Sequence, residues 1–455
     1  MRIKIKEKKI FRKIIENFFG YKLESINSFC TDSREVKQND IFIPIKGDYV
    51  DPHRFIFETF DKNPSLIFSE KIIKDYLPNG NKTTTVGYGD TGIINVESTM
   101  DTLKNIASEL MKFFKSPTIA ITGSNGKTTT KEMLVDIFNY KHKVNHTMGN
   151  YNSSIGLPVN LFNFCLNADL NILEMGASKP DEIDYLCQII KPDYSLITNI
   201  QNAHIGNFSS FDELINTKTA IFRNTKIDGL VFENLDDINI SNYCKDIHNK
   251  VSFSFNDTKA DFFGEITDSK ALFINGKPIF NSNLNQIMAQ NMLASYSIAN
   301  TYGIEHDVIQ AAFKNFHFLK GRGSHINKNG YLIIDDTYNA NFDSFKIGID
   351  DFMDINCKGN KVLIIGDMKE LGEKSPEYHI QLGEYINSKV PDFVFSFGNL
   401  ISKTTLQIKN KKTFSKHFDT MDSLINNLNS YLTVGDHIYI KASRSMKFEN
   451  IIDRI

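Results

Sequence analysis

Residues 118 to 138 constrain the fold of this chain more than any other segment. An apolar run, TIAIT at 118 to 122, leads into the loop TGSNGKTTT at 122 to 130, and a helical stretch runs from 127 to 138. In such a unit the glycines let backbone N–H groups close around phosphate oxygens, and the helix N-terminus adds positive potential. The segment therefore predicts a phosphate-binding loop in an α/β domain.

Two side chains of this loop can carry phosphate chemistry. Lys127 supplies a positive charge, and the hydroxyl of Thr128 can bind Mg²⁺. The strict pattern has a further glycine at the position that Ile121 occupies here, so the loop is a shortened variant. We predict that a nucleotide contacts the following loop residues: Gly123, Ser124, Asn125, Gly126, Lys127, Thr128 and Thr129.

Length and composition narrow the possible functions. At about 150 residues per domain, 455 residues predict about three domains. The 52 Lys and Arg residues against 54 Asp and Glu residues give a net charge of −2, which disfavours a dedicated nucleic-acid binder. Because 41% of the residues are hydrophobic, we expect a folded chain rather than a disordered one.

Cysteine usage and hydropathy indicate where the protein works. The 5 cysteines are scattered and form no C-x-x-C pair, which fits a reducing compartment better than a disulfide or zinc framework. No apolar run approaches the roughly 18 residues of a membrane-spanning helix. We therefore expect a cytoplasmic protein without membrane insertion.

The pattern of apolar runs predicts an α/β fold in three domains. Residues 1–97 read as a small α/β domain, and its first helix should turn Phe11, Ile14, Ile15 and Phe18 toward a core. A capping sequence at Ser98 opens residues 98–320, the phosphate-loop domain with a mostly parallel sheet. Residues 321–455 follow a KGRG linker at 320 to 323 and read as a Rossmann-like domain. The strands expected in the last two domains are 118–122, 171–175, 195–200, 229–233, 252–255, 331–335, 362–366, 393–398 and 437–441.

Polar side chains at or just beyond strand ends are candidate metal ligands. Glu174 comes near the end of the 171–175 run, and His204 follows the 195–200 run. Ligands of open parallel sheets bind beyond the carboxyl ends of the strands, and Mg²⁺ prefers oxygen ligands. Glu174 therefore fits a metal ligand better than His204 does, although each also fits an ordinary polar residue in such a place.

Three further residues have two readings each. Lys218 lies in a helical segment and, on the residues alone, is a surface lysine. Arg322 follows a glycine and could reach a phosphate, whereas Asp336 ends a strand and could bind a ribose hydroxyl. On the residues alone, Arg322 and Asp336 would more often be ordinary surface groups.

Several motifs together resemble the Mur ligases. In order along the chain these are TGSNGKTTT, GNYNSSIGLP (149–158), LEMGAS (173–178), TNIQNAHIGNF (198–208), DDTYNANFDSF (335–345), GDMKELGE (366–373) and KASRSMKFENII (441–452). The phosphate loop is shared with folylpolyglutamate synthase. The YNAN and GDMKELGE segments are most similar to those Mur ligases that add D-alanyl-D-alanine.

The resemblance implies a reaction. It implies an ATP-dependent ligase that joins D-Ala-D-Ala to the carboxyl end of UDP-N-acetylmuramoyl tripeptide in peptidoglycan precursor synthesis. ATP would convert the carboxylate into an acyl phosphate, which the amine attacks. It also implies a first domain for the UDP end, a central ATPase domain and a third domain that closes over the site, with Mg²⁺ as cofactor.

The resemblance also implies roles for single residues. Lys218 matches a lysine that can be carbamylated, although Ala220 stands where the family has Glu. The implied catalytic residues are Lys127, Glu174, His204, Lys218 and Arg322, and the implied metal ligands are Thr128, Glu174 and His204. Besides the loop, the implied ATP contacts are Asn291, Arg322 and Asp336. The implied substrate contacts are Asp32, Ser33, Arg34, Asn150, Asn152, Asn339, Asn341, Ser443 and Arg444.

Two departures from the family pattern bear on details. Ile287 and Met288 stand where a ring residue and an asparagine usually precede Asn291, which affects the contacts to the base. Phe342 replaces the proline usual after YNAN, which should change the stiffness of the loop more than its chemistry.

Other functions remain open at this point. Another Mur ligase or a folylpolyglutamate synthase-like ligase would share the phosphate loop. A GTPase-like hydrolase is suggested by TKID at 225 to 228, a four-residue match that chance explains better. A non-catalytic scaffold is a third possibility, which the intact loop disfavours. We expect a monomer that binds no nucleic acid.

Overall fold

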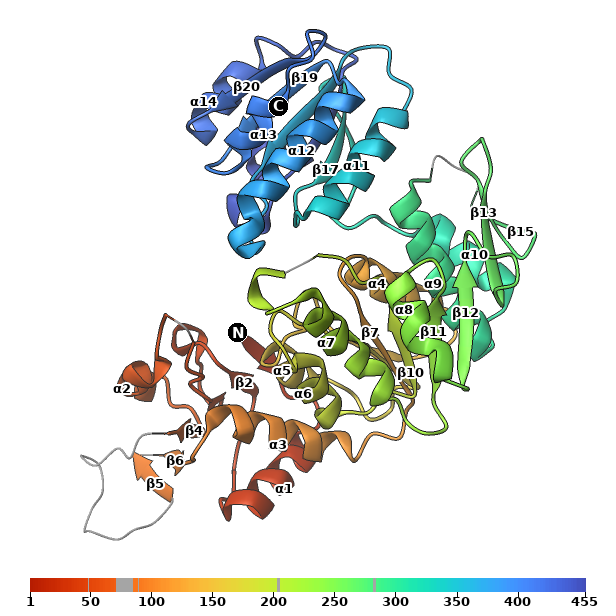
Figure 1. Cartoon of the computed structure of the whole chain (residues 1–455). Coiled ribbons are helices and arrows are strands. Elements are labelled where there is room, and N and C mark those ends of the chain that lie inside the picture. Colours follow the sequence, from red (N-terminus) through yellow and green to blue (C-terminus); the bar gives the residue numbers. More distant parts are fainter. Residues whose placement is uncertain (48, 71–84, 89, 203–204, 281–283) are drawn as a thin grey trace.

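The computed structural model describes the whole chain apart from residues 48, 71–84, 89, 203–204 and 281–283. It contains three sheets, and each lies within one of the three expected segments of the chain (Figure 1). The α/β fold class with mostly parallel sheets is therefore confirmed. The domain limits at residues 97 and 320 stay a prediction.

The N-terminal sheet has six strands in the order β1-β2-β3-β4-β6-β5. Its inner strands run parallel, and β1 and β5 pair antiparallel at the two edges. The elements are β1 (Arg2–Lys4), α1 (Lys8–Phe19), β2 (Ser28–Cys30), β3 (Ile41–Phe42), α2 (Ile56–Phe60), β4 (Leu66–Ser69), β5 (Thr85–Tyr88) and β6 (Thr91–Asn95).

The central sheet has nine strands in the order β15-β14-β13-β12-β11-β10-β7-β9-β8. All strands from β7 to β13 pair parallel with their neighbours among them, whereas β14 and β15 continue the sheet antiparallel. The strands are β7 (Thr118–Thr122), β8 (Val144–His146), β9 (Leu170–Glu174), β10 (Tyr194–Ile197), β11 (Leu230–Asn234), β12 (Lys250–Ser254), β13 (Phe262–Ile266), β14 (Leu272–Ile274) and β15 (Lys277–Phe280).

Helices cover both faces of the central sheet (Figure 1). Ser98 caps α3 as expected, since its side chain accepts a hydrogen bond from the Asp101 backbone N–H. The central helices are α3 (Thr99–Met111), α4 (Lys127–Phe138), α5 (Gly156–Leu161), α6 (Glu182–Ile189), α7 (Phe211–Arg223), α8 (Ile238–Tyr243), α9 (Gln286–Tyr302) and α10 (His306–Asn315).

The C-terminal sheet has the order β16-β17-β21-β18-β19-β20 and is parallel except for β16. Its strands are β16 (Ser324–Lys328), β17 (Tyr331–Asp336), β18 (Lys361–Gly366), β19 (Phe393–Phe397), β20 (Phe414–Phe418) and β21 (His437–Lys441). Its helices are α11 (Phe342–Asp354), α12 (Ser375–Lys389), α13 (Ile401–Gln407), α14 (Met421–Leu428) and α15 (Glu449–Ile452).

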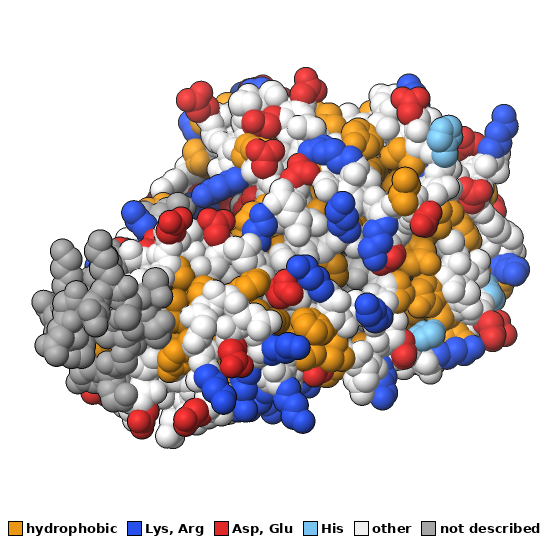
Figure 2. Space-filling model, turned by 90° about the horizontal axis from the view of Figure 1, so that it is seen from below, with side chains coloured by type: hydrophobic (Ala, Val, Ile, Leu, Met, Phe, Trp, Pro, Cys, Tyr) orange, Lys and Arg blue, Asp and Glu red, His pale blue; other side chains and the backbone are white. Residues whose placement is uncertain are grey.

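The hydropathy of the helices and the distribution of surface charge both bear on function. None of the helices in the described residues is both long and apolar enough to cross a membrane. On the face shown in Figure 2, Lys and Arg side chains are interspersed with Asp and Glu side chains rather than gathered in one continuous band.

The N-terminal and central domains share one hydrophobic core. Phe162, just after α5, packs its ring 5.0 Å from that of Phe11 and 4.7 Å from that of Phe29, measured between centroids. Backbone contact joins the two domains as well, since the Lys6 N–H donates to the Phe162 carbonyl at 3.0 Å. These two domains are therefore one packed unit.

The predicted core face of α1 is wrong at one position. Phe11, Ile14 and Ile15 are buried, but Phe18 is 43% exposed. Phe18 lies in the last turn before the helix ends at a left-handed Gly20, and Phe19 instead reaches the sheet, 5.2 Å from the ring of Phe68.

Removing the Phe162 ring should destabilise both domains together. Phe162→Ala deletes a fully buried ring and leaves a cavity, so we expect it to lower the free energy of unfolding by about 3–5 kcal/mol. Phe18→Ala removes an exposed ring and should cost less than about 1 kcal/mol. Urea unfolding followed by circular dichroism measures both, and equal losses for the two variants would contradict the shared core.

Candidate functional site

The phosphate loop is fixed from the neighbouring strand. The loop begins where β7 ends, and Gly123 and Gly126 take φ values of 144° and 83°, which favour glycine. The backbone N–H of Asn125 donates to the Asn199 side chain at 3.0 Å, and the Thr198 hydroxyl donates to the Asn125 carbonyl at 2.6 Å. The segment after β10 therefore holds the loop in shape.

Lys127 begins α4 and folds back over the loop. Its Nζ donates to the carbonyl of Gly123 at 2.7 Å and to that of Ser124 at 3.0 Å. Loss of solvent lowers the pKa of Lys127 to about 8, while Glu174 acts to raise it and Arg322 to lower it further. Thr128 and Thr129 lie buried beside it in the first turn of α4.

Lys218 lies inside the molecule, so the reading of a surface lysine is wrong. It is buried on α7, and its Nζ donates to the same Gly123 carbonyl at 3.1 Å. The helix turns this position toward the sheet, a direction that the sequence segment alone does not reveal. Burial, together with the nearby charge of Lys127, lowers the pKa of Lys218 well below its ordinary value. The neutral form of a lysine amine is a nucleophile.

Glu174 ends β9 beside the loop. In the parallel pairing of β7 with β9, Glu174 is the partner of Ile121. Its Oε1 accepts from the Asn152 side chain at 2.6 Å, and its backbone N–H donates to the Thr147 hydroxyl at 2.8 Å. Its Oε2 is buried and has no hydrogen-bond partner among the described residues. A buried carboxylate oxygen in this state fits the oxygen ligands that Mg²⁺ prefers.

The remaining metal candidate cannot be placed. His204 lies outside the described residues. Within the described ranges, no group of three or more His, Cys, Asp or Glu residues could hold a metal by itself.

A cavity of about 420 Å³ lies between the central and C-terminal domains. The predicted nucleotide and substrate residues that line it are Asn125, Gly126, Thr129, Asn291, Arg322, Asp336 and Asn339. Ile287 and Met288 line it as well. Asn291 sits so close to the loop that a Cβ at Gly126 would overlap its side-chain oxygen.

The C-terminal domain presents charged groups to this cavity. The Arg322 guanidinium stacks over the Tyr338 ring at 3.9 Å. Asp336 accepts from the Tyr439 hydroxyl at 2.8 Å and from Lys441 Nζ at 2.5 Å. The Asn341 side chain donates to that of Asn125 at 2.9 Å, which joins the domain directly to the phosphate loop.

The other predicted substrate residues lie in three places. Ser443 accepts from the Lys369 backbone N–H at 2.8 Å, and Arg444 pairs with Glu449 at 2.9 Å. Asn150 lies in an exposed loop, and Asn152 in the same loop holds Glu174, as described above.

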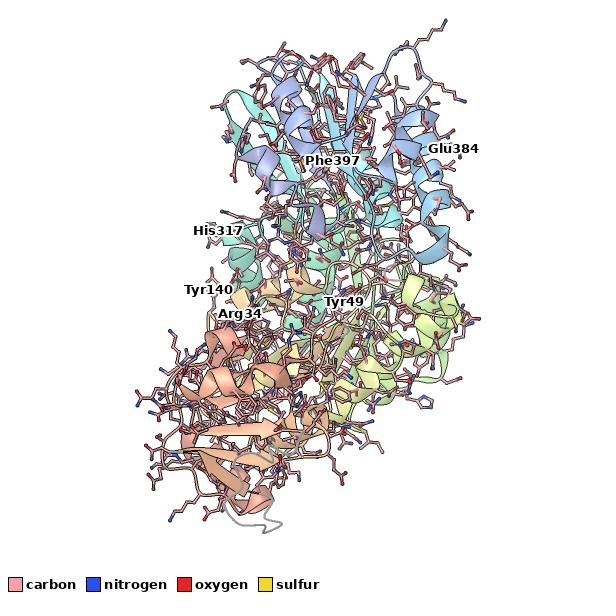
Figure 3. All side chains as sticks on the ribbon, turned by 90° about the vertical axis from the view of Figure 1, so that its left-hand side faces the viewer. Arg34, Tyr49, Tyr140, His317, Glu384 and Phe397 are labelled. Atoms are coloured by element: carbon pink, nitrogen blue, oxygen red, sulfur yellow. The ribbon has the colours of Figure 1, made fainter. Side chains whose placement is uncertain are left out.

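Asp32, Ser33 and Arg34 belong to the N-terminal domain, and Figure 3 shows Arg34 well apart from Phe397 of the C-terminal domain. Arg34 forms a two-point ion pair with Asp32, with N–O distances of 2.9 and 2.6 Å, and this pair lowers the pKa of Asp32 to about 2. Their substrate contacts stay a prediction.

Sequence reasoning missed several residues that shape the site. They are Lys131, Thr147, Asn199 and Tyr338. Lys131 carried a usable signal, because a residue four positions after Lys127 lies on the same helix face. The others act through contacts between distant segments.

Comparison with known proteins assigns the chain to a family. A model of the Mur ligase middle domain matches residues 121–305, and one of the Mur ligase glutamate ligase domain matches residues 321–444. The UDP-N-acetylmuramoyl-tripeptide–D-alanyl-D-alanine ligase of Buchnera aphidicola subsp. Baizongia pistaciae is 32% identical, over 95% of this chain and 92% of its own length. The chain belongs to the Mur ligase family.

Further relatives of this Mur ligase cover nearly its whole length. The enzyme of the same name from Bacillus subtilis is 29% identical, over 95% of this chain and 93% of its own. The crystal structure of MurF ligase from Thermotoga maritima in complex with ADP superposes with a TM-score of 0.80 at 29% identity, over 95% of this chain and 97% of that one. A MurF structure from Acinetobacter baumannii has a TM-score of 0.83 at 25% identity, with 97% of each chain covered.

Lys127 should link phosphate binding by this Mur ligase to pH. Because its pKa is about 8, its ammonium form is lost as the pH rises through that value. A bound phosphate stabilises the ammonium form, so we expect ADP binding to take up a proton, and to weaken, as the pH rises from about 8 to 10.

Calorimetry of ADP binding in buffers of different ionisation enthalpy measures this uptake. Lys127→Met should abolish it, and Lys143→Met, at an exposed position, should not. Equal proton uptake by wild type and Lys127→Met would contradict the assignment.

Proposed function

We propose that this Mur ligase joins D-alanyl-D-alanine to the carboxyl end of UDP-N-acetylmuramoyl tripeptide, with conversion of ATP to ADP and phosphate, in peptidoglycan precursor synthesis. Curated relatives over nearly the full length carry this activity in their names. The observation that carries the proposal is the phosphate loop with Lys127 and Glu174, set beneath a cleft that the C-terminal domain completes.

A carboxylate is a poor acylating agent, and this explains why the site needs a phosphate loop. Its oxygen attacks the γ-phosphorus of ATP, the bond to the β-phosphate oxygen breaks, and ADP leaves. The dipeptide amine then attacks the acyl carbon of the acyl phosphate, phosphate departs and the amine loses a proton. Lys127 and the loop N–H groups neutralise charge on the transferring group.

Magnesium fits the oxygen atoms beside the loop. The Thr128 hydroxyl and the unpartnered Oε2 of Glu174 would hold it, with His204 as a further proposed ligand. When bound, Mg²⁺ supplies positive charge to the phosphate oxygens. The Asn152 side chain keeps the Glu174 carboxylate turned so that Oε2 stays available.

The remaining ATP contacts come from two domains. We assign Asn291 to the adenine, Asp336 to the ribose and Arg322 to the phosphates, and all three line the cavity. Tyr338 holds the Arg322 guanidinium in place by stacking. Since groups from both domains are needed, phosphoryl transfer depends on their approach.

The substrates would extend away from the loop in two directions. We assign Asp32, Ser33 and Arg34 to the uridine end, and Asn150, Asn339, Asn341, Ser443 and Arg444 to the peptide and dipeptide. We also propose that the enzyme acts as a monomer. We propose that the reaction takes place in the cytoplasm, where ATP and UDP-linked precursors are available.

The defining experiment is phosphate release from MgATP with UDP-N-acetylmuramoyl tripeptide, with and without D-Ala-D-Ala. We expect release to require the dipeptide and the product to gain one dipeptide less water. Lys127→Ala should lower turnover by about 100-fold or more, because it removes charge at the transferring phosphoryl group. Phosphate release without the amine, or from GTP alone, would instead indicate a hydrolase.

Lys218 should carry a carbamate in the active enzyme. The neutral amine attacks CO₂, an N–C bond forms and one proton is lost, which turns the side chain into an anion that can help to place a metal. We expect Lys218→Ala to lower turnover by about 10- to 100-fold and added short carboxylates to restore part of it.

Lys226→Ala, at an exposed ion pair with Asp193, is the matched control and should retain activity. Activity of wild type that is independent of bicarbonate, together with an active Lys218→Ala variant, would contradict the carbamate.

A further inference from the structure

One buried charge beside the site has no part in the proposed reaction. Lys131 lies on α4, one turn after Lys127, and its side chain is fully buried. Its Nζ donates to the Thr147 carbonyl at 2.6 Å and pairs with Glu132 at 2.6 Å. Burying an ammonium group is costly, and an apolar side chain of similar size often serves stability as well. The contact to Thr147 therefore calls for another explanation.

Thr147 is held on several sides. Its backbone N–H donates to the Ile172 carbonyl at 3.1 Å. The Asn160 side chain brackets it, accepting from the Met148 N–H at 3.2 Å and donating to the His146 carbonyl at 3.3 Å. Thr147 is therefore a fixed point between β8 and the loop that follows.

Two residues of the segment 147–152 form hydrogen bonds with Glu174. The Thr147 hydroxyl accepts from the Glu174 backbone N–H, and Asn152, five residues further along the same loop, donates to Oε1. Both the main chain and the carboxylate of Glu174 thus depend on residues 147–152. Lys131 ties these residues to the helix whose first turn carries Thr128.

We propose that Lys131 is a positioning residue that sets Glu174 relative to Thr128, and so sets the geometry of the magnesium site. The inference rests on the proposed function, because that function assigns the metal to these two residues. A charged donor suits this task, since hydrogen bonds from ammonium groups are shorter and stronger than neutral ones. Supporting contacts of this kind typically change metal affinity by about 10- to 100-fold when they are removed.

The test is ADP binding by the full chain, measured by calorimetry at increasing Mg²⁺ concentration. In Lys131→Met we expect metal-free ADP affinity and thermal stability close to wild type, and a Mg²⁺ concentration for half-maximal enhancement raised by about 10-fold. Thr147→Val removes the acceptor for the Glu174 N–H and should give a similar shift. Thr147→Ser keeps that oxygen and should restore wild-type behaviour.

Two controls separate the hydrogen bond to Thr147 from the loss of a lysine or of an ion pair in general. Lys250 makes the same pair of contacts elsewhere in the central domain, to the Cys244 carbonyl at 2.8 Å and to Glu233 at 3.1 Å. Lys250→Met should leave the Mg²⁺ dependence unchanged. Glu132→Gln removes the ion pair but keeps the Lys131 contact to Thr147, so it should also behave as wild type.

The possible outcomes are distinct. Unchanged Mg²⁺ dependence in Lys131→Met and Thr147→Val overturns the inference, and so does a joint loss of thermal stability and metal-free binding, which marks a merely structural lysine. If Lys131→Met does not fold, the Thr147 pair decides. If ADP binding by wild type itself shows no Mg²⁺ dependence, the proposed metal site fails first and the inference falls with it.

Discussion

The parallel pairing of β7 with β9 and β10 is the constraint on which the site depends. It sets Ile121 beside both Glu174 and Leu196, so that three strands deliver their carboxyl ends to one edge of the sheet. The phosphate loop leaves from the middle strand, the carboxylate ends one neighbour, and the segment after the other neighbour fixes the loop through Thr198 and Asn199. The chemical groups therefore meet because of backbone register, and side-chain contacts then refine their positions.

Desolvation lowers the pKa values of the two lysines at this edge of the sheet. Lys127 and Lys218 donate to the same Gly123 carbonyl, and burial lowers the pKa of both. A second ammonium group so close to the first would raise the free energy of both, because little solvent is available to screen them, and this favours the neutral form of Lys218. Anything that supplies negative charge relieves this cost, whether a phosphate group against Lys127 or a carbamate formed on Lys218. The same arrangement thus favours anion binding at one lysine and nucleophilic reactivity at the other.

The sequence allowed the local elements of this structure to be predicted, but few of the contacts between distant segments. Apolar runs and the glycine loop predicted β7, α4, β9 and β17 because each is encoded by consecutive residues. Lys218 looked like a surface residue because its burial depends on which face α7 turns to the sheet, and Phe18 looked buried because periodicity does not show where a core ends. The contact between Asn125 and Asn341 joins residues 216 positions apart, so no local pattern could indicate it. The antiparallel β14 and β15 were missed for a similar reason, since they extend a sheet whose other strands are parallel.

The three domains differ in how firmly they are joined, and this difference bears on catalysis. The N-terminal and central domains share a core through Phe162, so separating them would expose aromatic rings. Several contacts between the central and C-terminal domains are polar: Asn341 to Asn125 at 2.9 Å, the Gly206 N–H to the Glu370 carbonyl at 3.3 Å, and Lys270 to Asp354 at 3.6 Å. Ile205 of the central domain also packs against the C-terminal core. Polar contacts can exchange with water at little cost, so separating these two domains should expose less apolar surface than separating the N-terminal and central domains. The C-terminal domain, which brings Arg322 and Asp336 to the cleft, is therefore the part whose displacement should cost least, while Glu174 and the phosphate loop lie on one shared sheet.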